Sequence, residues 1–186
     1  MKYEVIESKD KISELRSKIY DHALETYNRI KQDIDNNSPW DLFADIKFNK
    51  FGVDPIEGTP LNFIEQLNQM FSDLVVLYAV EELLDKYPDK QFEVNFGAKA
   101  GFDIRSTDNK VVAECFAVTG VDSNGKLRAD AKKLMKLPAD VEKYIFFYSR
   151  NDSEEIVEKR YESFPEIIFK RINGSHTEGE SNIYVY

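Results

Sequence analysis

The spacing of apolar residues changes near residue 91, and this change limits the folds open to the chain. Residues 59–86 place apolar side chains on well over half of a helical circumference, which predicts a long and mostly buried helix. Thr59-Pro60 is a typical helix start, and Pro88 ends the pattern. Beyond residue 91 the apolar residues alternate, as in strands. Three strands are expected, over 91–96, 101–105 and 110–118.

The rest of the chain has weaker patterns. A helix is expected from Ser8 to about Asp35, after a strand over 3–6. Residues 40–58 alternate aromatic residues with turn formers, which predicts an irregular segment whose rings pack on the core, with base stacking as the alternative. Further helices are expected over 127–137 and 153–163, and strands over 143–149, 165–172 and 182–186.

Composition excludes several classes of protein. The chain has 186 residues and a net charge of −9, which argues against a non-specific polyanion binder but leaves a local basic cleft open. Cys115 is the only cysteine, so a disulfide framework and a zinc site of several thiolates are excluded. His22 and His176 are too far apart to suggest a histidine metal cluster. No signal segment or membrane-spanning apolar run is found, which favours a cytoplasmic location without a membrane partner.

Two acidic residues stand out in the strand region. Asp103 lies between Phe102 and Ile104, and Glu114 lies in an apolar strand between Ala113 and Cys115. Side chains alternate along a strand, so Glu114 is expected on the opposite face from Cys115. A carboxylate in such a strand is costly to bury unless it is paired or bound to a cation. Two neighbouring carboxylates repel each other, and a divalent metal such as Mg²⁺ resolves that repulsion.

The order of helix, three strands, helix and strand, with Asp103 on the second strand and Glu114 on the third, resembles the PD-(D/E)XK phosphodiesterases. The resemblance covers about residues 59–150. It implies a restriction-endonuclease-like α/β core, a central mixed sheet flanked by helices, in which Asp103 and Glu114 hold Mg²⁺ or Mn²⁺. It also implies that a glutamate on the preceding helix assists, and Glu65 is the residue that matches.

The chain departs from the family pattern at the motif lysine. Phe116 occupies that position, two residues after Glu114, and a phenylalanine can neither orient a water molecule nor stabilise charge on a phosphate. The candidates for a replacement cation are Lys99, Lys132 and Lys133. The two latter residues belong to the most basic stretch of the chain, residues 126–136, which could contact phosphates.

The sequence is thus expected to form one compact domain, an α/β core of residues 59–186 with an N-terminal helical extension of residues 1–58 packed on it. The expected function is Mg²⁺-dependent hydrolysis of DNA phosphodiester bonds, with DNA favoured over RNA, as in a restriction or defence endonuclease. The extension would shape a nucleic-acid cleft or a homodimer interface. The alternative is a catalytically inactive nuclease fold that binds nucleic acid or protein, which the phenylalanine at the motif position favours.

Overall fold

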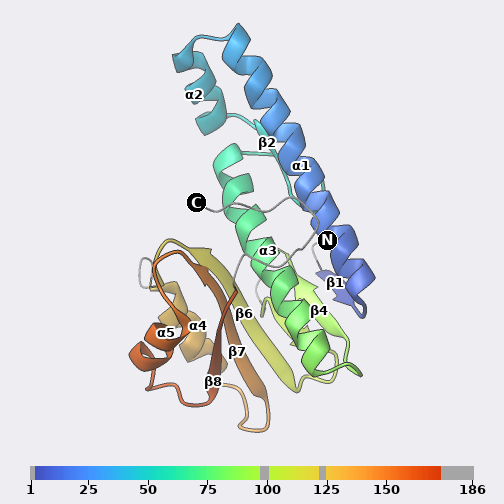
Figure 1. Ribbon diagram of the computed structural model, residues 1–186, viewed down its shortest axis with the longest axis vertical. Helices are drawn as coiled ribbons and strands as arrows, with labels where there is room; N and C mark the ends of the chain where they lie inside the picture. Colours follow the sequence, from blue (N-terminus) through green and yellow to red (C-terminus); the bar gives the residue numbers. More distant parts are fainter. Residues whose placement is uncertain (1–2, 97–100, 122–124, 173–186) are drawn as a thin grey trace.

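A six-stranded mixed sheet organises the protein (Figure 1). The computed structural model describes residues 3–96, 101–121 and 125–172. The strands lie in the order β1-β4-β5-β6-β7-β8; the first four are antiparallel neighbours, and β6, β7 and β8 run parallel. Their bounds are β1 Tyr3–Ile6, β4 Phe92–Asn95, β5 Ile104–Ser106, β6 Val111–Val118, β7 Glu142–Ser149 and β8 Ile167–Arg171. The chain is therefore an α/β protein with a mixed sheet flanked by helices, as predicted.

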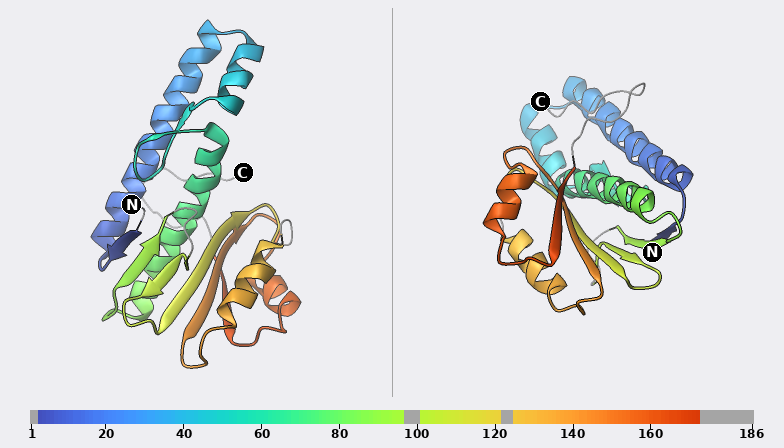
Figure 2. Two further views of the ribbon diagram at one scale, coloured as in Figure 1. Left: turned by 180° about the vertical axis from the view of Figure 1, so that it is seen from behind. Right: turned by 60° about the horizontal axis from the view of Figure 1, so that its bottom comes forward.

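Helices cover both faces of this sheet (Figure 2). On one face lie α1 (Lys9–Asn36) and α3 (Phe63–Lys86), whose apolar side chains share a core with Ala113 and Cys115 of β6. On the other face lie α4 (Lys126–Leu134) and α5 (Glu154–Arg160), which form a second core with the opposite side of β6. The two cores follow from the strand alternation, because successive residues of β6 point to opposite faces.

The crossovers explain why the sheet changes from antiparallel to parallel. A four-residue turn joins β5 to β6, and such a tight connection forms an antiparallel pair. Helices α4 and α5 connect β6 to β7 and β7 to β8, and a helical crossover is what parallel neighbours require. The strands expected over 91–96, 110–118, 143–149 and 165–172 are confirmed with small shifts at their ends.

Residues 37–61 differ from the prediction. The segment 40–58 was expected to be irregular, but Pro39–Phe48 forms a helix, α2. Ser38 caps this helix by accepting a hydrogen bond from the backbone amide of Asp41 at 3.2 Å. Thr59-Pro60 does not start α3; Pro60–Leu61 is a short strand, β3, paired with β2 (Gly52–Val53). The prediction that the rings of this segment pack on the core is wrong for Trp40, Phe43 and Phe48, which are exposed.

The start of α3 is set instead by Asn62, whose side chain accepts a hydrogen bond from the amide of Ile64 at 2.9 Å. Buried Gln66, one turn later, ties the small β2–β3 sheet to both long helices. Its Oε1 accepts hydrogen bonds from the amide of Val53 at 3.1 Å and from the hydroxyl of Thr26 at 2.8 Å.

Residues 1–58, expected to be a helical extension packed on the core, also contribute a strand to the main sheet. β1 is an edge strand of the main sheet and pairs with β4, and the expected boundary at residue 58 falls inside the β2–β3 hairpin. Three segments project beyond the sheet: the C-terminal part of α1, the whole of α2 and the first turns of α3 (Figure 1). None of the helices in the described ranges is both long enough and apolar enough to cross a membrane. The strand expected over 182–186 and His176 lie outside the described residues.

Candidate functional site

Asp103 and Glu114 come together at the centre of the sheet. In the antiparallel pairing of β5 and β6, Ile104 lies opposite Ala113, so one further residue places Asp103 opposite Glu114 on the same face. Asp103 directly precedes β5, and its Oδ2 accepts a hydrogen bond from the amide of Cys115 at 2.7 Å. The expectation that Glu114 and Cys115 point to opposite faces is confirmed, because Cys115 packs in the α3-side core.

Glu114 is buried in this position. Only 3% of its side chain is exposed, and its strand neighbours Val112 and Phe116 belong to the apolar core beneath α4 and α5. Burial, together with the negative charge of Asp103, raises the pKa of Glu114 to about 8. A carboxyl with such a pKa holds its proton at neutral pH unless a cation replaces it.

Lys133 reaches this carboxyl from α4. Its ammonium group forms an ion pair with Oε1 of Glu114 and donates a hydrogen bond to the carbonyl of Gly101. The same ammonium lies 4.5 Å from the centre of the Phe102 ring, a cation–π arrangement. Since 40% of the Lys133 side chain is exposed, this lysine extends from the surface to the buried carboxyl.

A second lysine of α4, Lys126, lies one heptad before Lys133 and therefore on the same helical face. It pairs with Asp130 at 2.9 Å and lies 5.6 Å from the centre of the Phe116 ring. Burial opposes the charged form of Lys126, but the hydrogen bond to Asp130 and the charges of the acid pair raise its pKa above the ordinary lysine value. The sequence placed Lys126 only in the basic stretch of residues 126–136 and did not predict that Lys126 and Asp130 lie near the acid pair, although their i,i+4 spacing was a usable signal.

The other predicted site residues lie elsewhere. Glu65 is exposed in the first turn of α3, which covers the face opposite Glu114, so the structure does not bring it to the acid pair. Lys132 is exposed on α4 and points away from the face that carries Lys133. Lys99 lies outside the described residues. Phe116, at the position of the motif lysine, is buried and stacks on Phe147 with ring centres 6.3 Å apart.

Two further features lie apart from the acid pair. A cavity of about 380 Å³ lies between α3 and the ends of β6 and β7, mainly on the face opposite Glu114, so it does not extend the acid-pair site. Its lining residues are Leu67, Asn68, Phe71, Ala117, Val118, Thr119, Tyr148 and Arg150.

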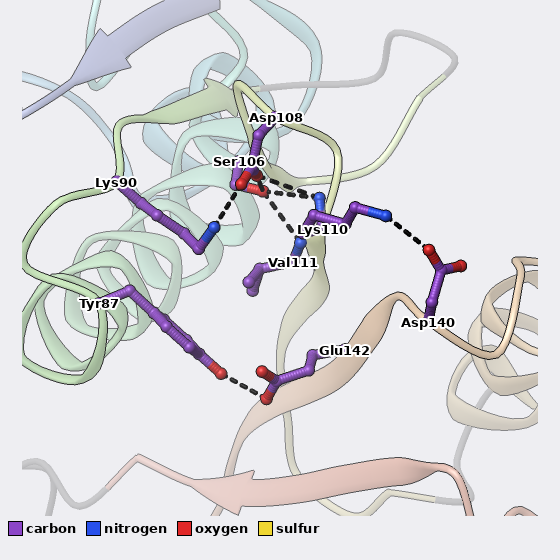
Figure 3. Close-up of polar contacts among 8 residues, drawn as sticks. All are labelled: Tyr87, Lys90, Ser106, Asp108, Lys110, Val111, Asp140 and Glu142. Atoms are coloured by element: carbon purple, nitrogen blue, oxygen red, sulfur yellow. Dashed lines mark hydrogen bonds and ion pairs between the residues drawn. The ribbon is translucent and has the colours of Figure 1, made fainter.

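The second feature is a polar cluster at the start of β6 and β7, shown in Figure 3. Here Asp108 pairs with Lys90, Asp140 pairs with Lys110 at 2.5 Å, and Glu142 accepts hydrogen bonds from Tyr87 and Lys86. Its carboxylates are largely exposed and each already has a lysine partner. These ion pairs therefore hold the loops together at this end of the sheet. Each of the three carboxylates already has a partner, so none is free for a ligand.

The acid pair thus consists of one carboxylate on β6 and one directly before β5, with one lysine bound to the buried carboxylate and a second lysine nearby. Across the described ranges, no group of three or more His, Cys, Asp or Glu side chains is placed to hold a metal ion, so any ion here would be bound by two carboxylates and completed by other ligands. Comparison with protein-family models, curated proteins and solved structures finds no match to this chain.

Proposed function

We propose that this chain is a cytoplasmic Mg²⁺-dependent endonuclease that hydrolyses phosphodiester bonds of DNA, with a restriction-endonuclease-like core. The observation that carries the proposal is the cross-strand pair of Asp103 and Glu114 with the ammonium group of Lys133 on it. The order α3, β4, β5, β6, α4 and β7 agrees with the helix–three-strand–helix–strand order that the resemblance requires, which supports the same reading.

The acid pair fits Mg²⁺ or Mn²⁺ by its chemistry. Mg²⁺ prefers oxygen ligands and commonly binds through one or two carboxylates, with water and substrate phosphate as the other ligands. The raised pKa of Glu114 reflects burial and a neighbouring negative charge, and a divalent cation relieves both costs. Asp103 and Glu114 would hold the ion. When bound, the ion would polarise the phosphate and lower the pKa of a coordinated water molecule.

The role of the missing motif lysine falls to Lys133 in this proposal. Its ammonium group contacts Glu114 of the acid pair, so it can stabilise negative charge that develops at a phosphate there. Arg128 and Lys132 are exposed and four residues apart on the outer face of α4. Neither has an ion-pair partner in the described part of the chain, and both are free to contact the phosphate backbone, which supports DNA as the substrate.

The test is a cleavage assay with Lys133→Ala and Lys132→Ala as a matched pair. Both variants remove one lysine from the same helix, so they change the net charge equally. Lys133→Ala is expected to lower cleavage of plasmid DNA by about 100-fold or more, the scale of losing one preorganised electrostatic group. Lys132→Ala is expected to retain cleavage within a few-fold. Equal losses in both variants would contradict the role of Lys133.

The second candidate function is a catalytically inactive nuclease fold that binds nucleic acid or protein. Phe116 favours it, because a buried aromatic ring fills the motif position, and so does the Glu114–Lys133 pair, which neutralises the buried carboxylate without a metal. Wild-type protein that binds DNA but cuts neither DNA nor RNA with Mg²⁺ or Mn²⁺ would establish this alternative over the nuclease.

A further inference from the structure

The helices that project beyond the sheet expose an unusual amount of apolar surface. Trp40 is 80% exposed and Phe48 is 79% exposed, and both belong to α2 together with Phe43. The buried residue of this helix is Leu42, which lies on the other side from these three rings at 100° per residue. The aromatic face of α2 is therefore turned away from the protein's own core.

The adjoining helix α1 has a similar face. Leu24, Tyr27 and Ile34 are more than half exposed, and their spacing places them in one stripe along the helix. The buried residues of α1, Ile12, Leu15, Ile19 and Thr26, form a separate stripe roughly 100° around the helix from it. The helix thus carries two apolar stripes, of which only one packs on the core. The members of the exposed stripe are three and seven residues apart, and this spacing keeps them on one side of the helix, where another helix can pack.

We propose that the α1–α2 surface, defined by Leu24, Tyr27, Ile34, Trp40, Phe43 and Phe48, is the interface of a homodimer. These side chains offer on the order of 700 Å² per chain, taking about 150–250 Å² for a whole aromatic side chain and correcting for exposure. A stable interface buries about 800 Å² on each partner. The exposed apolar surface of these six residues, taken together, is close to the area of one such interface.

The charge of this region disfavours a nucleic acid as the partner. Residues 20–48 carry six acidic and three basic side chains, and a polyanion would be repelled by that excess. The same excess disfavours an anionic membrane surface. The composition instead matches the centre of protein interfaces, where Trp, Tyr and Phe are enriched. A two-fold axis would bring the same stripe of each copy together, which a self-complementary apolar surface permits.

Trp40 provides a direct probe, because it is the only tryptophan of the chain. Sedimentation equilibrium of the full chain is expected to give twice the monomer mass of 21.6 kDa at micromolar concentration. Dilution to nanomolar concentration is expected to shift the emission of Trp40 to longer wavelength as the indole becomes exposed. A monomer at about 100 μM with the emission of a solvent-exposed indole would overturn the proposal.

The matched variants are Phe43→Arg/Phe48→Arg in the surface and Ile156→Arg/Ile168→Arg outside it. All four residues are exposed apolar side chains, so both double variants should retain the wild-type circular dichroism. The first is expected to weaken association at least 100-fold, and the second is expected to leave it unchanged. If the first variant does not fold, Tyr27→Lys/Ile34→Lys tests the same surface from α1. Folded variants of the surface that remain dimeric would place the interface elsewhere and refute the proposal.

Discussion

Glu114 and the carboxylates at the start of β6 and β7 each pair with a lysine of their own, but their surroundings differ. Glu114 is buried, and its pKa is raised because burial outweighs the ion pair with Lys133. Asp108 and Asp140 are exposed, and hydrogen bonds to Lys90 and Lys110 lower the pKa of their carboxyl groups (Figure 3). Burial therefore decides the direction of the shift. Of the two clusters, only the buried one contains a carboxyl whose ionisation is disfavoured, and a further cation would favour that ionisation.

Metal binding is the strongest test of the difference between the buried and the exposed carboxylates. Asp103→Asn and Glu114→Gln are each expected to lower the affinity for Mn²⁺ by about 100-fold, because each removes one of two carboxylate ligands. Wild-type affinity should rise with pH up to about 8, since the metal must displace the proton of Glu114. Isothermal titration calorimetry measures both effects.

The control for metal binding is the double variant Asp108→Asn/Asp140→Asn, which removes two carboxylates from the exposed cluster. Its Mn²⁺ affinity is expected to equal that of the wild type. If this variant loses as much affinity as Glu114→Gln, the ion binds at the exposed cluster, which contradicts the proposal.

The pH dependence of stability provides the next test. Folded protein holds the proton of Glu114 up to about pH 8, while the unfolded chain releases it near pH 4.5. The raised pKa therefore stabilises the metal-free fold fully below pH 4.5, and this contribution is lost as the pH rises through 8. The loss is expected to be on the order of 4 kcal/mol and absent in Glu114→Gln, measured by urea unfolding between pH 5 and 9.

The exposed cluster should show the opposite sign. The lowered pKa values of Asp108 and Asp140 stabilise the fold above about pH 4, and that contribution is lost on acidification. Parallel stability curves for wild type and Glu114→Gln between pH 5 and 9 would show that the pKa of Glu114 is not raised. The predicted opposite pH dependence of the two clusters would then be wrong.

Local patterns predicted the sheet well. The alternation along β6 was enough to place Glu114 and Cys115 on opposite faces, because the parity of a strand depends only on its own residues. The choice among Lys99, Lys132 and Lys133 could not be made in the same way. It depends on how α4 lies across β6, which is set by the packing of Leu127, Ala131 and Leu134 beneath the helix.

The two Ser/Thr-Pro pairs show where local signals fail. Ser38-Pro39 and Thr59-Pro60 are chemically equivalent helix starts, yet only the first begins a helix. Thr59-Pro60 follows Gly58, whose φ of 69° turns the chain back so that Pro60 pairs with Val53. Likewise, nothing in the sequence distinguished the aromatic rings of α2 from core residues, because exposure depends on which helices lie alongside.

The smallest expected effect is the coupling between Lys110 and Asp140 of the exposed cluster. Their side chains are 54% and 64% exposed, so water and salt screen the ion pair and its formation restricts two mobile side chains. In a double-mutant cycle with Lys110→Ala and Asp140→Ala, the changes in unfolding free energy are expected to add without measurable coupling. The same cycle on Lys133→Ala and Glu114→Gln should show clear coupling, because 3% exposure leaves Glu114 little access to water. Coupling at Lys110–Asp140 that equals or exceeds the coupling at Lys133–Glu114 would mean that burial does not separate the two clusters. The strength of the Glu114 pair would then be no guide to where a cation binds.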